Sequence, residues 1–363
     1  MKIIFIVIVA LILPLSCQEI GNDASNRESQ RFEEPSVNRT RVKFHILSQN
    51  PFPIYDFIYY KGSILGATTR IGDGKRQLFD FDETEKQWRL SVIDIPKLKW
   101  EDIKAISLNK DSLWYVSQSG FVIKSEPDTN NWEIVSQVKI SDPKFISFAD
   151  NKVGFLVGDI FTRENLGCEI FKTEDGGRTW NKVFESKLSG NASSLEVINE
   201  NEILVAMNDE YLLQTQDSGK IWNPIVFDSE ITNFTEILKL DKTGAKDLTI
   251  SPDGNFWVVG EKGSIYFSTD RGNSWKKPSS LPNSLNDKSK LTSIAFSPTG
   301  EGVIVGYDGL ILVSYDNGLS WEDLTNDLKK DNENISLEKF MKISFTNKTF
   351  TILGVSGIYQ LSF

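Results

Sequence analysis

Residues 268–275 read STDRGNSW, and variants of this stretch recur through the chain. The motif returns as TEDGGRTW (173–180), TQDSGKIW (215–222) and SYDNGLSW (314–321), with weaker relatives FDETEKQW (81–88) and SEPDTNNW (125–132). The tryptophans that end these six stretches are separated by 44, 48, 42, 53 and 46 residues. Self-similarity at a period of this length indicates a fold built from repeated supersecondary units.

The four stronger copies have the composition of a tight turn between two strands. An Asp carboxylate can accept backbone N–H groups across such a turn, and a Gly two residues later supplies a positive φ. The Trp then starts the next strand and covers the turn with its large ring. We predict structural roles for the following residues: Asp175, Gly177, Trp180, Asp217, Gly219, Trp222, Asp270, Gly272, Trp275, Asp316, Gly318 and Trp321.

Each period has room for four short strands. Residues 246–278 offer a strand and a Pro-Asp-Gly turn, the apolar strand NFWVVG, a tight turn, the strand SIYFS, and a fourth strand beginning at SWKK. Short strands with regular turn signals indicate an all-β protein, and about four strands per repeat indicate a β-propeller.

The two ends of the repeat region predict the number of blades. After the sixth Trp the chain supplies three strands, KFMKISF, TFTILG and IYQLSF, but no fourth. Residues 41–47, RVKFHIL, form a strand that precedes the first full blade. If this N-terminal strand pairs with the last blade, seven blades close into a ring without exposed sheet edges. We therefore predict a seven-bladed β-propeller over residues 41–363.

The motif resembles the Asp-box (BNR) repeat, and two longer stretches resemble one family that contains it. WVVGEKGSIYFSTDRGNSW (257–275) and VIVGYDGLILVSYDNGLSW (303–321) are similar to the repeats of photosystem II assembly-factor propellers. The resemblance implies Asp-box turns between the third and fourth strands, at the blade periphery and away from the ligand face. It also implies a non-enzymatic scaffold that binds a protein or protein complex, whereas the photosystem substrate does not carry over.

An extracellular glycan-active hydrolase of the sialidase-like type is the alternative, because sialidases share the Asp-box. Their chemistry requires three arginines, a Tyr–Glu nucleophile pair and an Asp. Arg178 and Arg271 lie inside the motifs, and the Phe-Arg-Ile-Pro signature is absent. Other glycosidases use paired carboxylates about 5–10 Å apart, which the sequence alone does not place. A glycan therefore remains an alternative ligand, and no catalytic residue is assigned.

The N-terminus is predicted to be an export signal. Residues 3–13 are apolar, too short to span a membrane, and are followed by Pro14-Leu15-Ser16-Cys17. We expect a lipoprotein signal peptide over residues 1–16, lipidation of Cys17, and a polar, flexible tether over residues 17–40. The mature protein would then be anchored in a membrane by its lipid, on the periplasmic side or at the cell surface.

Composition excludes several other functions. The net charge is −10 at pH 7, which argues against nucleic acid as a partner. Cys168 is the only cysteine besides Cys17, and His45 is the only histidine. No disulfide is expected in the mature protein, Cys168 is expected to be a buried structural thiol, and neither a metal site nor a cofactor is predicted.

Two loops that are longer than their equivalents are the predicted partner-binding sites, because function concentrates in loops on a rigid scaffold. The loop of the first blade spans residues 70–76, and that of the third blade spans residues 158–167. Tyr307, in the short turn of the sixth blade, is a candidate aromatic neighbour. The candidate residues are Arg70, Lys75, Arg76, Ile160, Phe161, Arg163 and Tyr307.

Overall fold

The computed structural model describes residues 42–49, 54–60, 63–68, 78–82, 84–85, 87–91, 95–98, 101–109, 112–125, 131–161, 166–186, 190–208, 211–226, 244–331, 335, 337–346 and 348–363. Residues 41–363 form one compact unit. The predicted signal peptide, Cys17 and the tether lie outside the described residues.

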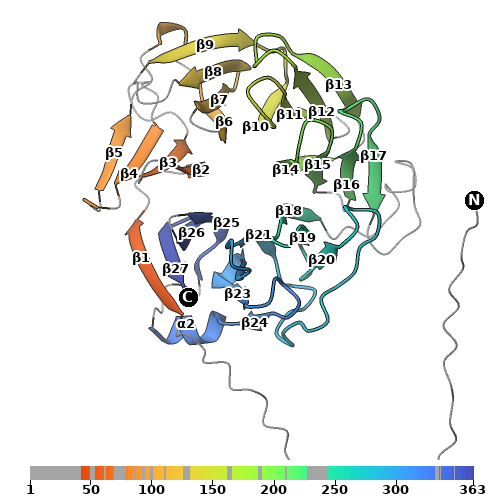
Figure 1. The fold of residues 1–363 in the computed structure, drawn as a ribbon. Helices are drawn as coiled ribbons and strands as arrows, with labels where there is room; N and C mark the ends of the chain where they lie inside the picture. Colours follow the sequence, from red (N-terminus) through yellow and green to blue (C-terminus); the bar gives the residue numbers. More distant parts are fainter. Residues whose placement is uncertain are drawn as a thin grey trace, which may run out of the picture. The chain divides into compact units, whose positions relative to one another are not determined.

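The predicted seven-bladed propeller is confirmed (Figure 1). Blade 1 comprises β2 (Ile54–Tyr60), β3 (Ser63–Thr68), β4 (Leu78–Asp82) and β5 (Gln87–Ser91). Blade 2 comprises β6 (Ile103–Asn109), β7 (Ser112–Ser117), β8 (Phe121–Ser125) and β9 (Trp132–Gln137), and follows the short helix η1 (Pro96–Leu98). Blade 3 comprises β10 (Asp142–Phe148), β11 (Gly154–Phe161), β12 (Leu166–Thr173) and β13 (Asn181–Ser186). Blade 4 comprises β14 (Ala192–Val197), β15 (Ile203–Met207), β16 (Tyr211–Thr215) and β17 (Asn223–Val226).

The remaining blades depart from this pattern in small ways. Blade 5 has β18 (Ala245–Ile250), β19 (Phe256–Gly260) and β20 (Ile265–Ser268). Blade 6 has β21 (Leu291–Phe296), β22 (Gly302–Gly306), β23 (Ile311–Ser314) and β24 (Glu322–Asp323), with η2 (Tyr307–Gly309) in its second turn and α2 (Thr325–Asp331) after it. Blade 7 has β25 (Phe340–Thr346), β26 (Thr349–Gly354) and β27 (Gly357–Ser362), completed by β1 (Lys43–Gln49).

The N-terminal strand closes the ring as predicted. β1 pairs antiparallel with β27, with Lys43 opposite Ser362 and His45 opposite Gln360. His45 is therefore an exposed residue of the closing strand. The first and last segments of the propeller are thereby held in one sheet, which removes an exposed edge.

The sequence predicts a fourth strand in blade 5, but this segment does not form a full strand. After the Asp-box turn, pairing with β20 is limited to one bridge, in which Phe267 and Lys276 exchange backbone hydrogen bonds of 2.8 and 2.9 Å. Pro278 follows two residues later and has no N–H to continue the ladder.

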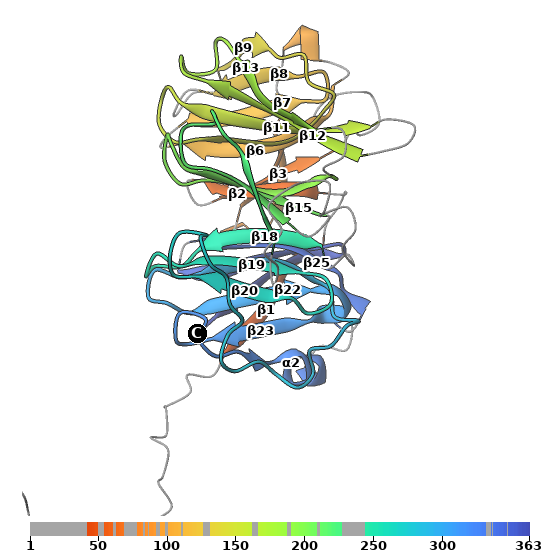
Figure 2. The same ribbon diagram turned by 90° about the vertical axis from the view of Figure 1, so that its right-hand side faces the viewer.

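The blades follow one another around the ring (Figures 1 and 2), and the core lies between the faces of neighbouring blades. One cluster joins blades 3 and 4 and includes the fully buried residues Phe155, Cys168 and Val205. The buried thiol of Cys168 has a raised pKa, because burial disfavours the thiolate. This placement agrees with a structural role for this residue.

Each complete Asp-box turn also contacts the preceding blade. In blade 5, Asp270 Oδ1 accepts hydrogen bonds from Ser268 Oγ and Ser274 N, each 2.8 Å long, and Trp275 Nε1 donates to Gly272 O at 3.0 Å. Gln214 of blade 4 donates to Arg271 O at 2.8 Å. The turns therefore stabilise their own hairpins and the contacts between blades.

Gly318 provides a test of this packing. Its φ is +87°, and a Cβ there would overlap the ring of Trp257, whereas Gly254 has φ +85° and a Cβ there would meet nothing within 4 Å. Both Gly→Ala variants carry the backbone strain, but only Gly318→Ala also forces Trp257 to move. We expect losses of unfolding free energy of about 2–4 kcal/mol for Gly318→Ala and about 1 kcal/mol for Gly254→Ala, measured by chemical denaturation. Equal losses would show that the close approach to Trp257 is unimportant.

Candidate functional site in the central channel

A β-bulge near the start of the inner strand is common to all seven blades. In each inner strand, the pairing register shifts between two residues that are two positions apart. These residues are Ile54/Asp56, Ile103/Ala105, Pro143/Phe145, Ala192/Ser194, Ala245/Asp247, Leu291/Ser293 and Phe340/Lys342. A bulge leaves one residue unpaired and changes the direction of the neighbouring side chains. The seven residues after the bulges thus occupy equivalent places on the inner strands: Asp56, Ala105, Phe145, Ser194, Asp247, Ser293 and Lys342.

Asp247 connects three blades from this position. Its Oδ1 accepts a hydrogen bond of 2.8 Å from Ser194 Oγ in blade 4. Its Oδ2 accepts hydrogen bonds from Ser293 Oγ at 2.5 Å and Ile294 N at 3.1 Å, both in blade 6. Burial raises the pKa of Asp247, and these hydrogen bonds oppose the rise.

The row of hydrogen-bonded residues that includes Ser194, Asp247 and Ser293 continues into blades 7 and 1. Ser293 Oγ accepts a hydrogen bond of 3.1 Å from Ile343 N. Lys342 forms an ion pair with Asp56 across the closure of the ring. Burial tends to lower the pKa of Lys342, but the charges of Asp56 and Asp247 outweigh it and leave the pKa raised. We call this row the polar belt: Ser194, Asp247, Ser293, Lys342 and Asp56.

Lysines in the bulges of blades 2 and 3 join a second set of ion pairs. Lys104 Nζ lies 3.1 Å from Asp142 Oδ1, and Lys144 Nζ lies 3.0 Å from Asp142 Oδ2 and 3.6 Å from Asp159 Oδ2. Asp159 Oδ1 in turn accepts a hydrogen bond of 2.9 Å from Ala192 N of blade 4. Burial raises the pKa of Asp142, but the hydrogen bonds from both lysines outweigh it and leave the pKa lowered.

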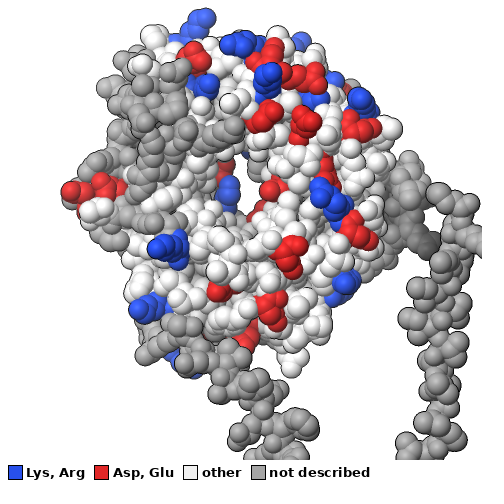
Figure 3. Space-filling view, in the orientation of Figure 1, with Lys and Arg blue, Asp and Glu red and all other residues white. Residues whose placement is uncertain are grey.

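The inner strands surround a cavity of about 860 Å³ to which all seven blades contribute. Figure 3 shows it as an opening through the centre of the ring, with acidic and basic side chains around it. A second hollow of about 370 Å³ shares Asp56, Phe145 and Lys342 with it and reaches Leu108 and Thr346. A concave site of this volume with a few convergent polar groups has the properties of a ligand-binding pocket.

Glu196 differs from the other charged groups of the cavity because it has no hydrogen-bond or ion-pair partner among the described residues. Two positions beyond the polar belt, the inner strands carry Ile58, Ser107, Ser147, Glu196, Thr249, Ala295 and Ser344, of which Glu196 alone is charged. Within the described part of the chain, its carboxylate has no hydrogen bond and no ion pair. Burial, and then the negative charge of Asp247, raise its pKa from 4.5 to about 7.

This raised pKa predicts a pH-dependent effect of Glu196→Gln on stability. The unfolded state releases the Glu196 proton near pH 4.5 and the folded state releases it near pH 7, so the wild type loses stability as the pH rises between these values. Gln removes this cost. We expect Glu196→Gln to be more stable than the wild type by about 1–3 kcal/mol at pH 8 and by less than about 1 kcal/mol at pH 5. Chemical denaturation at both pH values measures this difference.

Glu133→Gln is the matched control, because Glu133 is an exposed residue of β9. It should change stability at neither pH. If Glu196→Gln has the same stability as the wild type at pH 8, the environment inferred for Glu196 is incorrect.

The predicted partner-binding residues are only partly described. Arg70, Lys75, Arg76 and Arg163 lie outside the described residues. Ile160 and Phe161 were expected in a loop, but they belong to β11, because its pairing with β12 continues to Phe161 opposite Leu166. Phe161 and Leu166 are 56% and 44% exposed. Tyr307 lies in η2, with Lys290 Nζ at 5.6 Å and Lys339 Nζ at 5.3 Å from its ring centre.

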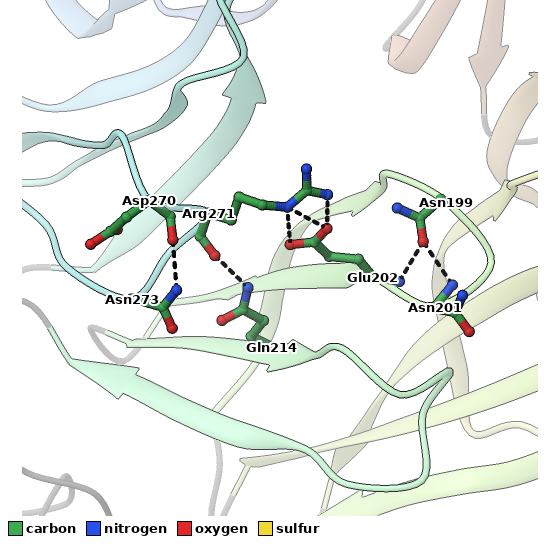
Figure 4. Close-up of polar contacts among 7 residues, drawn as sticks. All are labelled: Asn199, Asn201, Glu202, Gln214, Asp270, Arg271 and Asn273. Carbon is green, nitrogen blue, oxygen red and sulfur yellow. Dashed lines mark hydrogen bonds and ion pairs between the residues drawn. The ribbon is translucent and has the colours of Figure 1, made fainter. Parts of the chain in front are cut away.

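Arg271 lies at a blade junction and does not line the cavity (Figure 4). Its Nε donates to both carboxylate oxygens of the buried Glu202 in blade 4, at 3.3 and 3.0 Å. The described residues that line the larger cavity include no arginine and no tyrosine. The described lining of the larger cavity therefore lacks the arginines that a sialidase uses to bind a carboxylate, and the tyrosine among the described channel residues, Tyr59, lines the second hollow.

Neither a cluster of metal ligands nor a membrane-spanning helix occurs within the described residues. Among them, no group of three or more His, Cys, Asp or Glu side chains could hold a metal ion. None of the helices formed by these residues is long and apolar enough to cross a membrane.

Comparison with known families supports the resemblance to assembly-factor propellers. The family model described as photosynthesis system II assembly factor YCF48 matches residues 126–233. This region contains the Asp-box turns of blades 3 and 4, whereas the stretches that first suggested the family lie in blades 5 and 6. No curated protein matches the chain in sequence.

Solved structures share the fold at low sequence identity. A structure of YCF48 bound to D1 peptide has a TM-score of 0.65 and 17% identity, covering 90% of this chain and 96% of that one. YCF48 from Cyanidioschyzon merolae has a TM-score of 0.61 and 12% identity, with 88% and 98% covered. The GH74 enzyme from Niastella koreensis has a TM-score of 0.61 and 12% identity, covering 87% of this chain and 53% of that one. At these identities, the likeness establishes the fold.

Proposed function

We propose that this protein is a non-enzymatic scaffold that binds a segment of a partner protein at its central channel. The observation that carries this proposal is the open cavity of about 860 Å³, to which all seven inner strands contribute side chains. Its apolar and charged groups suit a polypeptide segment, which presents both kinds of side chain. The similar structure of YCF48 with a bound D1 peptide supports a protein as the class of ligand.

We also propose that the chain is exported and held at a membrane by a lipid on Cys17. The support is the short apolar run followed by Ser16-Cys17. Metabolic labelling with a fatty-acid analogue tests this proposal. The wild type should be labelled and Cys17→Ala should not, and equal labelling of both would refute lipidation at Cys17.

In-cell crosslinking of the full-length protein, followed by mass spectrometry, tests the scaffold function. We expect one protein or complex to be enriched reproducibly over a control strain that lacks this chain. Two double variants then test whether the predicted loops contribute to partner binding: Arg70→Ala/Arg76→Ala and Phe161→Ser/Leu166→Ser. Reproducible capture of no protein by the wild type would refute the scaffold.

A glycoside hydrolase is the second candidate, because Glu196 and Asp247 are two electrostatically coupled carboxylates in one cavity. A carboxyl group with a pKa of about 7 could serve as a general acid. Against this, Asp247 is engaged by donors from blades 4 and 6. A panel of chromogenic glycosides distinguishes the enzyme from the scaffold. Hydrolysis by the wild type that is lost in Glu196→Gln would favour the enzyme.

A further inference from the structure

The cations and anions of the central cavity are not equally available to a ligand. Among the described residues, the four lysines that line it all have carboxylate partners. Lys104 and Lys144 pair with Asp142, Lys246 pairs with Glu261 at 3.0 Å, and Lys342 pairs with Asp56. An anionic ligand would have to displace one of these carboxylates.

Glu196 and Asp247 present the opposite charge, and neither forms an ion pair within the described residues, although the charge of Lys342 favours the carboxylate of Asp247. Asp247 is engaged by hydrogen bonds, chiefly from neutral donors, and Glu196 has no partner among the described side chains. The other charged residues that line the cavity are Asp56, Asp102, Lys104, Lys144, Lys246, Asp247 and Lys342. Of these, Asp247 is the one whose charge affects the pKa of Glu196. The lysines among these residues are already paired, so a carboxylate at Glu196 has no counterion within the part of the chain that the structure describes.

The inner strands on either side of Glu196 carry Ser147 and Thr249 at its level, and Phe145 adds an apolar side chain to the cavity. Phe145 occupies the equivalent of the polar-belt position on the neighbouring inner strand β10 and lines both hollows. Long cationic side chains lay their methylene groups along such surfaces and keep the charged end on a polar partner. A lysine or arginine side chain that enters the channel thus finds the ring of Phe145 for its stem and the carboxylate of Glu196 for its head group.

We propose that the partner protein inserts a lysine or arginine side chain into the central channel, where its cationic group pairs with Glu196. This inference rests on the proposed scaffold function and adds the chemistry that selects the partner. Since the ion pair requires the carboxylate, binding should be stronger at pH 8 than at pH 5.5.

A peptide library tests this preference directly. Seven-residue peptides with Lys, Arg, norleucine, Gln or Glu at a fixed central position, and the same random composition elsewhere, are incubated with the purified full-length protein. We expect the Lys and Arg sets to be enriched about tenfold over the norleucine and Gln sets at pH 8, in line with a charge-assisted contact. This enrichment should be lost in Glu196→Gln and retained in Glu133→Gln. Equal enrichment of all five sets, or an unchanged preference in Glu196→Gln, would overturn the proposal.

An NMR titration of the Glu196 carboxylate provides a second readout. With ¹³C-labelled glutamate, the Glu196 resonance is assigned by its absence in Glu196→Gln. Addition of the enriched Lys peptides should lower the pKa of Glu196 from about 7 toward 4.5, because a nearby cation favours the carboxylate. An unshifted titration in the presence of bound peptide would show that the cation binds elsewhere.

In-cell crosslinking with Glu196→Gln separates this inference from the proposed function. If the wild type captures a partner and Glu196→Gln captures much less of it, both stand. If the wild type and Glu196→Gln capture the partner equally, the scaffold function is supported and the proposed role of Glu196 is refuted. If the wild type captures no protein, the scaffold function fails, and the peptide library alone decides whether the channel selects cations.

Discussion

The hydrogen-bonded carboxylate of Asp247 is the interaction on which the centre of the propeller depends. Neighbouring blades contact each other mainly through apolar side chains, and such contacts have little directional preference. Asp247 adds direction, because it accepts hydrogen bonds from Ser194 in blade 4 and from Ser293 and Ile294 in blade 6. A carboxylate that is partly removed from water is stabilised by such donors, so the hydrogen bonds constrain these strands relative to one another.

The bulges explain how this interaction is possible. Because each inner strand shifts register at the same place, one residue per blade reaches the same level of the ring. In five blades this residue belongs to the polar belt, while Ala105 and Phe145 occupy it in blades 2 and 3. At this level the ring therefore has a polar, internally bonded side in blades 4 to 7 and 1, and apolar residues in blades 2 and 3. Glu196 lies in blade 4, next to the blade that carries Phe145, where a ligand can meet both kinds of surface.

The repeat made the fold predictable, but the site was predictable only in part. The spacing of tryptophans such as Trp222 and Trp275 indicates blades, and the unpaired strand at each end indicates closure. The central carboxylates carry no local motif, because Asp247 and Glu196 become neighbours only through ring geometry. An alignment of the seven inner strands would have found one signal: ASSLEV (192–197) places an acid where the other strands have neutral residues. The continuation of β11 to Phe161 could not be read from a segment rich in charged and glycine residues.

Site-specific photo-crosslinking in the cell tests most directly whether the channel is the binding surface. A benzophenone amino acid is placed at Thr249, which lines the larger cavity, or at Ile221, which is 61% exposed in the Asp-box turn of blade 4. If the partner binds in the channel, we expect a discrete protein adduct from Thr249 and none from Ile221. An adduct from Ile221 with none from Thr249 would contradict it and place the binding surface at the periphery of the blades.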